Sequence, residues 1–89
     1  MEYTVGQLVI SKSGHDKGRK FLIKAIEGEY LYLIDGKHRP LDHPKKKKIK
    51  HVQATLSVDC GIKNKLKNDS YLLDAEIVKT IKVLSCIQE

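Results

Sequence analysis

The stretch Gly6–Ile23, which reads GQLVISKSGHDKGRKFLI, decides how the first part of the chain is interpreted. Its two ends are short aliphatic runs. The decapeptide between them, SKSGHDKGRK at residues 11–20, holds two glycines and four Lys or Arg residues. Apolar runs on either side of a glycine-bearing polar segment are typical of two strands joined by a loop. The stretch therefore predicts a β-hairpin with a basic loop.

The β pattern continues to residue 53. We expect five short strands, at residues 7–11, 20–26, 30–34, 37–41 and 49–53. The dipeptide Asp35-Gly36 is a strong hairpin signal, because a primed turn needs positive φ angles that Gly and Asp tolerate. The strand at 37–41 is only a candidate, and Pro40 would confine it to a sheet edge. Closure of such short strands into a small, strongly bent barrel would remove their open edges.

The rest of the chain changes to a helical pattern. Residues 59–67 are a candidate short helix with Asp59 as its N-cap, followed by a break at residues 68–70. We therefore expect a barrel over residues 1–53 and a helical C-terminal extension, packed on that barrel, over residues 54–89.

A clearer helix is expected from Asp74, which we predict to be its N-cap, with Leu73 packing on Val78 as a hydrophobic staple. Apolar residues then recur at helical spacing, at Ile77, Ile81, Leu84 and Ile87. We expect this stripe to be part of the core. A partner-binding groove or a dimer contact is the alternative.

The net charge of +6 lies entirely in the first part of the chain. Residues 1–53 carry 12 Lys or Arg against 6 Asp or Glu, whereas residues 54–89 carry 5 of each. This asymmetry indicates a polyanionic partner for the first part. No signal-like segment and no apolar run of roughly 18 residues is present, so we expect a cytoplasmic protein with no membrane contact.

The sequence disfavours catalytic and metal-binding functions. Cys60 and Cys86 are too few for a disulfide scaffold, and we expect reduced, partly buried thiols. The four histidines, at positions 15, 38, 43 and 51, match no usual zinc spacing. Neither a catalytic triad nor a nucleotide-type glycine loop is present. We expect no enzyme activity, no cofactor, no metal and no small-molecule substrate.

The loop at 11–20 has what contact with a nucleic-acid backbone requires. Gly14 and Gly18 permit close approach, and Lys or Arg side chains lie around them. We expect Asp16 to accept backbone N–H groups inside the loop as an Asx turn. The lysine run at 45–48 is a second candidate, because a polyanion would relieve its self-repulsion. The bland alternative is an ordinary polar hairpin with lysines that only confer solubility.

These two segments together resemble the KOW motif of large-subunit ribosomal proteins and transcription elongation factors. The loop matches at Gly14, Asp16, Gly18 and Arg19. Lys45–Lys48, followed by Ile-Lys-His-Val at 49–52, is similar to a later segment in the archaeal and eukaryotic-type ribosomal branch and in short bacterial proteins like it. The chain departs from that pattern with Ala54 in place of an expected proline and with a run made of lysine alone.

The resemblance implies a mainly β fold, an SH3-like barrel of about five strands whose first loop contacts RNA, in many members ribosomal RNA. We expect a non-enzymatic, ribosome-associated or ribosome-assembly RNA-binding protein that reads shape and backbone. The alternatives are a small-barrel protein-interaction module, with the C-terminal helix docking a partner, and a KOW-type transcription or DNA-associated factor. The candidate RNA-binding residues are Lys12, Ser13, Gly14, His15, Lys17, Gly18, Arg19, Lys20, Lys37, Arg39, Lys45, Lys46, Lys47, Lys48, Lys50 and His51. Phe21 is expected in the core, and Tyr30 and Tyr32 are expected at the barrel surface or against a helix, with base stacking as the alternative.

Overall fold

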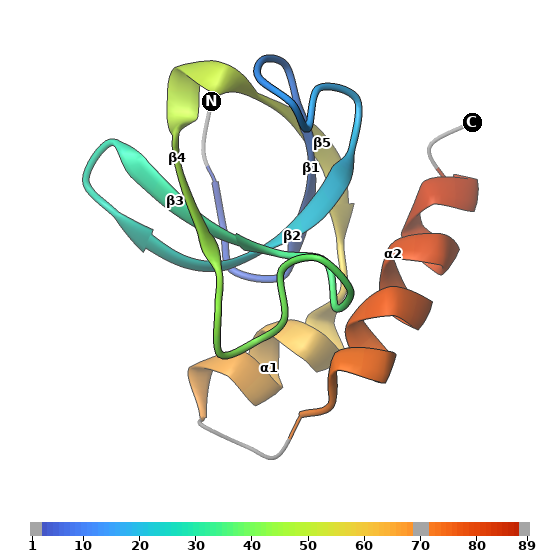
Figure 1. Cartoon of the computed structure of the whole chain (residues 1–89). Coiled ribbons are helices and arrows are strands. Elements are labelled where there is room, and N and C mark those ends of the chain that lie inside the picture. Colours follow the sequence, from blue (N-terminus) through green and yellow to red (C-terminus); the bar gives the residue numbers. More distant parts are fainter. Residues whose placement is uncertain (1–2, 69–71, 88–89) are drawn as a thin grey trace.

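A computed structural model describes residues 3–68 and 72–87 (Figure 1). Over these residues the chain has five strands, a 3-10 helix and two α-helices, in the order β1 (Gln7–Ser11), β2 (Lys20–Glu27), β3 (Tyr30–Ile34), β4 (Lys45–Lys48), η1 (Ile49–His51), β5 (Val52–Val58), α1 (Cys60–Lys67) and α2 (Asp74–Ile87). The strands form one antiparallel sheet with the order β4-β3-β2-β1-β5. The expected mainly β fold followed by a helical segment is confirmed.

The sheet is strongly bent, and both of its faces are buried (Figure 1). Alternate residues of a strand point to opposite faces. One face contributes Leu8, Leu22 and Ile34 to a core shared with the two helices. The other face packs on itself through Val9, Phe21, Ile23, Leu31, Leu33 and Val52. This second cluster confirms the expected core position of Phe21.

β4 and β5 are the two edges of the sheet, and η1 connects them directly. No pairing between these two strands is present in the described part of the chain, so the sheet is not closed. A shift of register between Gln7 and Val9 marks an irregularity in the pairing of β1 with β5. β5 also runs across the expected boundary between residues 53 and 54, which places the start of the expected extension in the sheet.

The predicted strand at residues 37–41 is wrong, and the strand that pairs with β3 is formed by the lysine run instead. The Asp35 side chain explains the difference. Its Oδ1 accepts from the backbone N–H groups of Lys37 and Arg39, at 2.9 and 2.8 Å. This closes a compact turn in which Asp35 N also donates to Arg39 O at 3.0 Å. The chain returns to the sheet only at Lys45, and residues 49–51, expected as strand, form η1.

The N-cap expected for α1 is confirmed, because Asp59 Oδ1 accepts from Ile62 N at 2.8 Å. The N-cap expected for α2 is wrong. Asp74 is the first residue of that helix, and its Oδ1 accepts from Leu41 N at 2.7 Å, which ties the helix to the segment between β3 and β4. At the start of the helix it is the Glu76 side chain that accepts a backbone N–H, because its Oε2 accepts from Leu73 N at 3.0 Å. The expected staple is not confirmed, since the Leu73 side chain is 47% exposed.

The apolar stripe of α2 belongs to the core, as predicted. Ile77 and Leu84 are buried in the cluster with Leu8 and Leu22, and Ile81 packs against it. The Ile87 side chain, expected to extend the stripe, and residues 69–70 of the expected break lie outside what the structure describes. The core interpretation of α2 therefore holds over the described stripe.

Two further findings concern expectations from composition. Cys60 and Cys86 carry free thiols, and both residues are exposed rather than partly buried. Within the described ranges, no helix has the length and apolar content needed to cross a bilayer.

Candidate nucleic-acid interface

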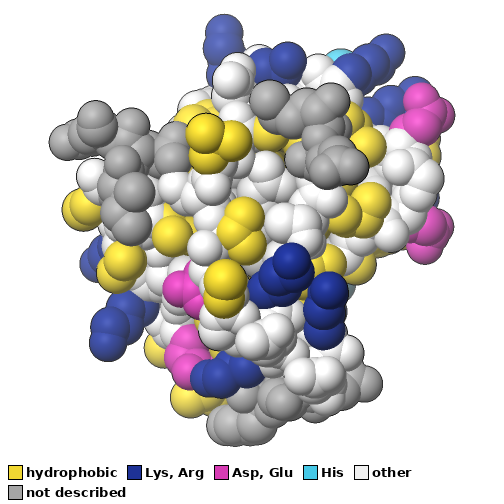
Figure 2. Space-filling model, turned by 180° about the vertical axis from the view of Figure 1, so that it is seen from behind, with side chains coloured by type: hydrophobic (Ala, Val, Ile, Leu, Met, Phe, Trp, Pro, Cys, Tyr) yellow, Lys and Arg dark blue, Asp and Glu magenta, His cyan; other side chains and the backbone are white. Residues whose placement is uncertain are grey.

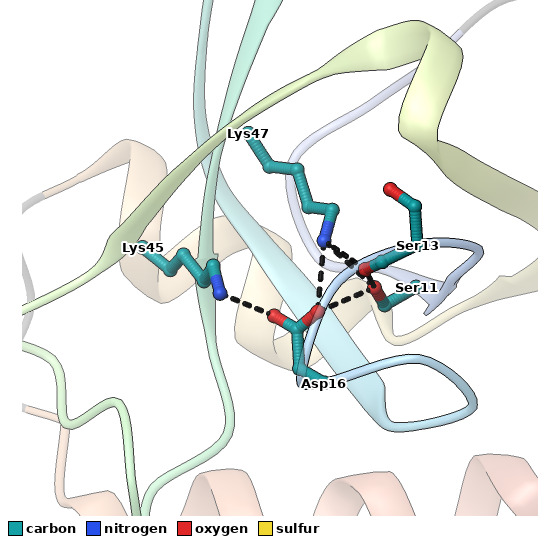
Figure 3. A network of polar contacts seen from close by, with 5 residues as sticks. All are labelled: Ser11, Ser13, Asp16, Lys45 and Lys47. Atoms are coloured by element: carbon teal, nitrogen blue, oxygen red, sulfur yellow. Dashed lines mark hydrogen bonds and ion pairs between the residues drawn. The ribbon is translucent and has the colours of Figure 1, made fainter.

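A buried polar cluster joins β4 to the loop between β1 and β2 (Figure 3). Lys47 of β4 directs its Nζ at Asp16 in that loop, 2.8 Å from Oδ1. The same ammonium donates to Ser11 Oγ and to the carbonyl oxygen of Ser13, each at 2.8 Å. Because an ammonium has three N–H donors, every donor of Lys47 has a partner inside the protein. The side chains of Lys47 and Asp16 are only 9% and 8% exposed.

A second lysine completes the neutralisation of Asp16. Lys45 Nζ lies 2.6 Å from Oδ2, and Ser11 Oγ donates to Oδ1 at 2.8 Å. Burial raises the pKa of the Asp16 carboxyl, but hydrogen bonds from Lys45, Lys47 and Ser11, together with the charge of Lys47, outweigh it. They hold the pKa of Asp16 well below its ordinary value of 3.8. Asp16 is therefore ionised at neutral pH, and its charge is offset inside the cluster.

The Asp16 carboxylate therefore has side-chain partners in place of the backbone N–H partners that an Asx turn would supply. Separate backbone bonds shape the loop, with Gly18 N donating to Ser11 O at 2.8 Å and Arg19 N donating to Asp16 O at 2.9 Å. Gly18 has a φ of +87° and open space around the position of a Cβ, so backbone conformation requires the glycine here. The repulsion expected within the lysine run is relieved for two of its four members by an internal acid.

The other two lysines of β4 lie beside Tyr30 of β3. Side chains of a strand alternate between faces, and Tyr30 pairs in register with Lys48. Lys46 Nζ is 4.4 Å from the centroid of the Tyr30 ring and Lys48 Nζ is 5.9 Å from it. Tyr30 and Tyr32 are half-buried. Tyr30, expected at the barrel surface or against a helix, has the ammonium groups of two lysines near its ring.

The two basic segments meet in one cavity of about 270 Å³. From the loop between β1 and β2 come His15, Asp16 and Arg19, and from β4 comes Lys45. The turn after β3 adds His38 and Arg39, while Phe21 supplies apolar lining. Arg19 and Lys45 therefore line the same cavity, and Asp16, the acid in its lining, is neutralised by Lys45 and Lys47.

The remaining candidate residues are not among those that line this cavity. Lys12 N donates to His51 O at 2.8 Å, which brings the start of the loop beside η1 (Figure 1). Exposed positions are taken by Lys12, Gly14, His15, Lys17, Gly18, Arg19, Lys20, Lys37, Lys46 and Lys50. Ser13, Arg39, Lys45, Lys48 and His51 are half-buried, and Lys47 is buried.

Three residues that line the cavity are not among the candidate RNA-binding residues: Asp16, Phe21 and His38. Of these, only His38 had no role predicted within the loop or the core. Its position next to Arg39, just after the Asp35-Gly36 turn, was the available signal. No group of three or more His, Cys, Asp or Glu side chains that could hold a metal ion is found over the described ranges.

Comparisons with known proteins add no assignment. No protein-family model matches the chain, and no curated protein matches it. The function must therefore be argued from the geometry of this surface.

Proposed function

We propose that this protein is a non-enzymatic RNA-binding protein whose bent sheet is an SH3-like barrel of the KOW type. It contacts the phosphate backbone of structured RNA, ribosomal RNA first among the candidates. Two parts of the protein contact the RNA together: the loop between β1 and β2, and the outer lysines of β4, which are Lys46 and Lys48. This assignment rests on the resemblance of residues 6–23 and 45–52 to the KOW pattern and on the charge of the first part of the chain.

The observation that carries the proposal is the meeting of the two basic segments. Arg19 and Lys45, 26 positions apart in the sequence, line the same cavity. The ion pair between Lys47 and Asp16 fixes the loop against β4. A rigid array of cations loses little conformational entropy when it binds a polyanion, and backbone contacts of this kind read shape rather than sequence.

The structure also changes which residues we assign to RNA. Lys47 has no free donor, so we assign it a structural role. Lys46 is exposed, with its ammonium over the face of Tyr30. Arg19 is exposed beside the cavity. Arg19 and Lys46 are therefore the residues whose charge reversal tests the proposal.

The test compares two double variants of equal net charge. Arg19→Glu with Lys46→Glu reverses two charges on the proposed surface, and Lys79→Glu with Lys82→Glu reverses two exposed charges on α2. Binding of a fluorescein-labelled RNA hairpin is followed by anisotropy, and folding by circular dichroism. We expect the first variant to lose most of the affinity and the second to lose little. Equal losses would leave only a general charge effect and would refute the assigned surface.

A protein-interaction function is the second candidate, and one observation favours it. Leu56, on the edge strand β5, is 94% exposed beside a cavity of about 620 Å³ that Tyr3 and Val58 also line. Docking through the stripe of α2 has lost its support, because Ile77 and Leu84 are buried. The back of the molecule shows hydrophobic side chains scattered among polar and charged ones (Figure 2). Slow hydrogen exchange in α2 of the free protein is expected for a core helix.

A further inference from the structure

The chain has only two arginines, Arg19 and Arg39, and both line the same cavity. The other 15 basic residues are lysines, of which only Lys45 is among the residues that line it. The two arginines lie on different elements, one at the end of the loop between β1 and β2 and one in the turn after β3. Their meeting is a product of the fold.

Arginine and lysine bind phosphate differently. A guanidinium presents a planar set of donors that match two phosphate oxygens at once, whereas an ammonium acts as a point charge. Two guanidinium groups that reach one cavity from different elements can therefore fix the position of one phosphate. A surface used only for general attraction has no such need.

The cavity has room for a phosphate group, and its lining suits an anion. Its volume of about 270 Å³ is just below the roughly 300–1,000 Å³ of pockets that enclose a drug-sized ligand. The acid in the lining, Asp16, is neutralised by Lys45 and Lys47, so it does not oppose an anion. His15 and His38 add N–H donors that can serve a phosphate oxygen.

The turn that carries Arg39 is held in place by α2. Asp35 shapes the turn through its bond from Arg39 N. Gly36 packs so closely on α2 that a Cβ would lie 2.4 Å from Asp74 O. Just beyond the turn, Leu41 N donates to Asp74 Oδ1, and Lys24 Nζ donates to Leu41 O at 2.6 Å. The turn that carries Arg39 is thus fixed by its contacts with α2 and is not a free loop.

We propose that this cavity binds a single phosphate group of the RNA backbone between Arg19 and Arg39. The inference rests on the proposed function and makes it more specific, because it distinguishes one fixed phosphate from the diffuse attraction of the surrounding lysines. The lysines supply long-range attraction, and the two arginines set the register of the strand on the protein.

The test uses charge-conserving substitutions. Arg39→Lys keeps the net charge, whereas Lys37→Ala, in the same turn but outside the cavity lining, removes one charge. If a guanidinium fork holds the phosphate, Arg39→Lys weakens binding of the RNA hairpin by about tenfold, the size of one lost charged hydrogen bond. Lys37→Ala then costs less than Arg39→Lys. Charge alone predicts the reverse order, and that order would overturn the inference.

A measurement on the unmodified protein gives an independent answer. Because the chain has two arginines, its NMR spectrum contains two arginine Nε–Hε signals. Both are expected to shift together when the RNA hairpin is added. A shift of only one signal, or of neither, would overturn the pocket. If the charge-reversed surface variant still loses affinity in that case, the proposed RNA-binding function stands and only the phosphate pocket is rejected.

Discussion

Lys47 Nζ lies 2.8 Å from Asp16 Oδ1, and this buried ion pair joins residues 31 positions apart in the sequence. The four lysines of the run fall into two pairs with different partners. Lys45 and Lys47 neutralise Asp16, while Lys46 and Lys48 lie beside Tyr30. Four identical residues in a row therefore have two roles. Lys45 and Lys47 hold the loop against β4, which we call the brace, and Lys46 and Lys48 form a basic surface outside it.

The brace predicts unequal effects at neighbouring lysines. Lys47→Met leaves a buried carboxylate without one of its two cations, and breaking a buried pair in this way costs about 3–5 kcal/mol. Lys46→Met removes only an exposed contact with Tyr30, so we expect a loss below about 1 kcal/mol. Urea unfolding followed by circular dichroism measures both. Similar losses for the two variants would show that the ion pair does not brace the loop.

The same ion pair predicts acid sensitivity. The folded-state pKa of Asp16 lies below its ordinary value, so its contribution to stability is complete above pH 3.8 and is lost as the pH falls below that value. Asp16→Asn cannot titrate at this position. We expect the free energy of unfolding of the natural chain to fall more steeply below pH 3.8 than that of the variant. If the free energy of unfolding of the two proteins fell in parallel with pH, Asp16 would not be the cause of the acid sensitivity.

Close packing between Gly36 and α2 predicts a costly alanine. Gly36→Ala would place a Cβ 2.4 Å from Asp74 O at a φ of +81°. Gly28 is the matched control, since its φ is +59° and no atom lies within 4 Å of its Cβ position. Gly28→Ala should cost about 1–2 kcal/mol from its φ alone. Thermal unfolding should show a clearly larger loss for Gly36→Ala, and equal losses would contradict the tight contact.

Asp74 predicts a difference between two variants of the same net charge. Asp74→Ala removes the acceptor for Leu41 N, whereas the amide oxygen of Asp74→Asn can still accept. We expect the alanine variant to lose about 1 kcal/mol more than the asparagine variant. Hydrogen exchange at the Leu41 amide should be fast only in the alanine variant. Equal protection would mean that Asp74 does not hold this segment.

Most of the fold could be predicted, because most of its strands show a local alternation of apolar and polar residues. Leu31 and Leu33 alternate with tyrosines, and Asp59 has the position of an N-cap, so periodicity and capping sufficed there. The strand of four lysines could not be predicted in the same way, since it has no apolar alternation. Its place in the sheet is set by pairing with β3, and the Asp35 turn delays that pairing until Lys45.

The candidate site was predictable in composition and less so in arrangement. Charge asymmetry identified the basic segments, and glycine spacing identified the loop. The burial of Lys47 was not predictable, because the three acceptors of its ammonium are brought together only by the fold. The same holds for the meeting of Arg19 with Arg39, which depends on how α2 holds the turn after β3.

The most direct measurement is the salt dependence of RNA affinity. If the loop and the outer lysines together neutralise roughly four to six phosphates, the logarithm of the association constant should fall against the logarithm of salt concentration with a slope of about −3 to −5. The fluorescein-labelled RNA hairpin, titrated at several salt concentrations, gives this slope. A slope near −1 would indicate an ordinary charged surface and would contradict the account.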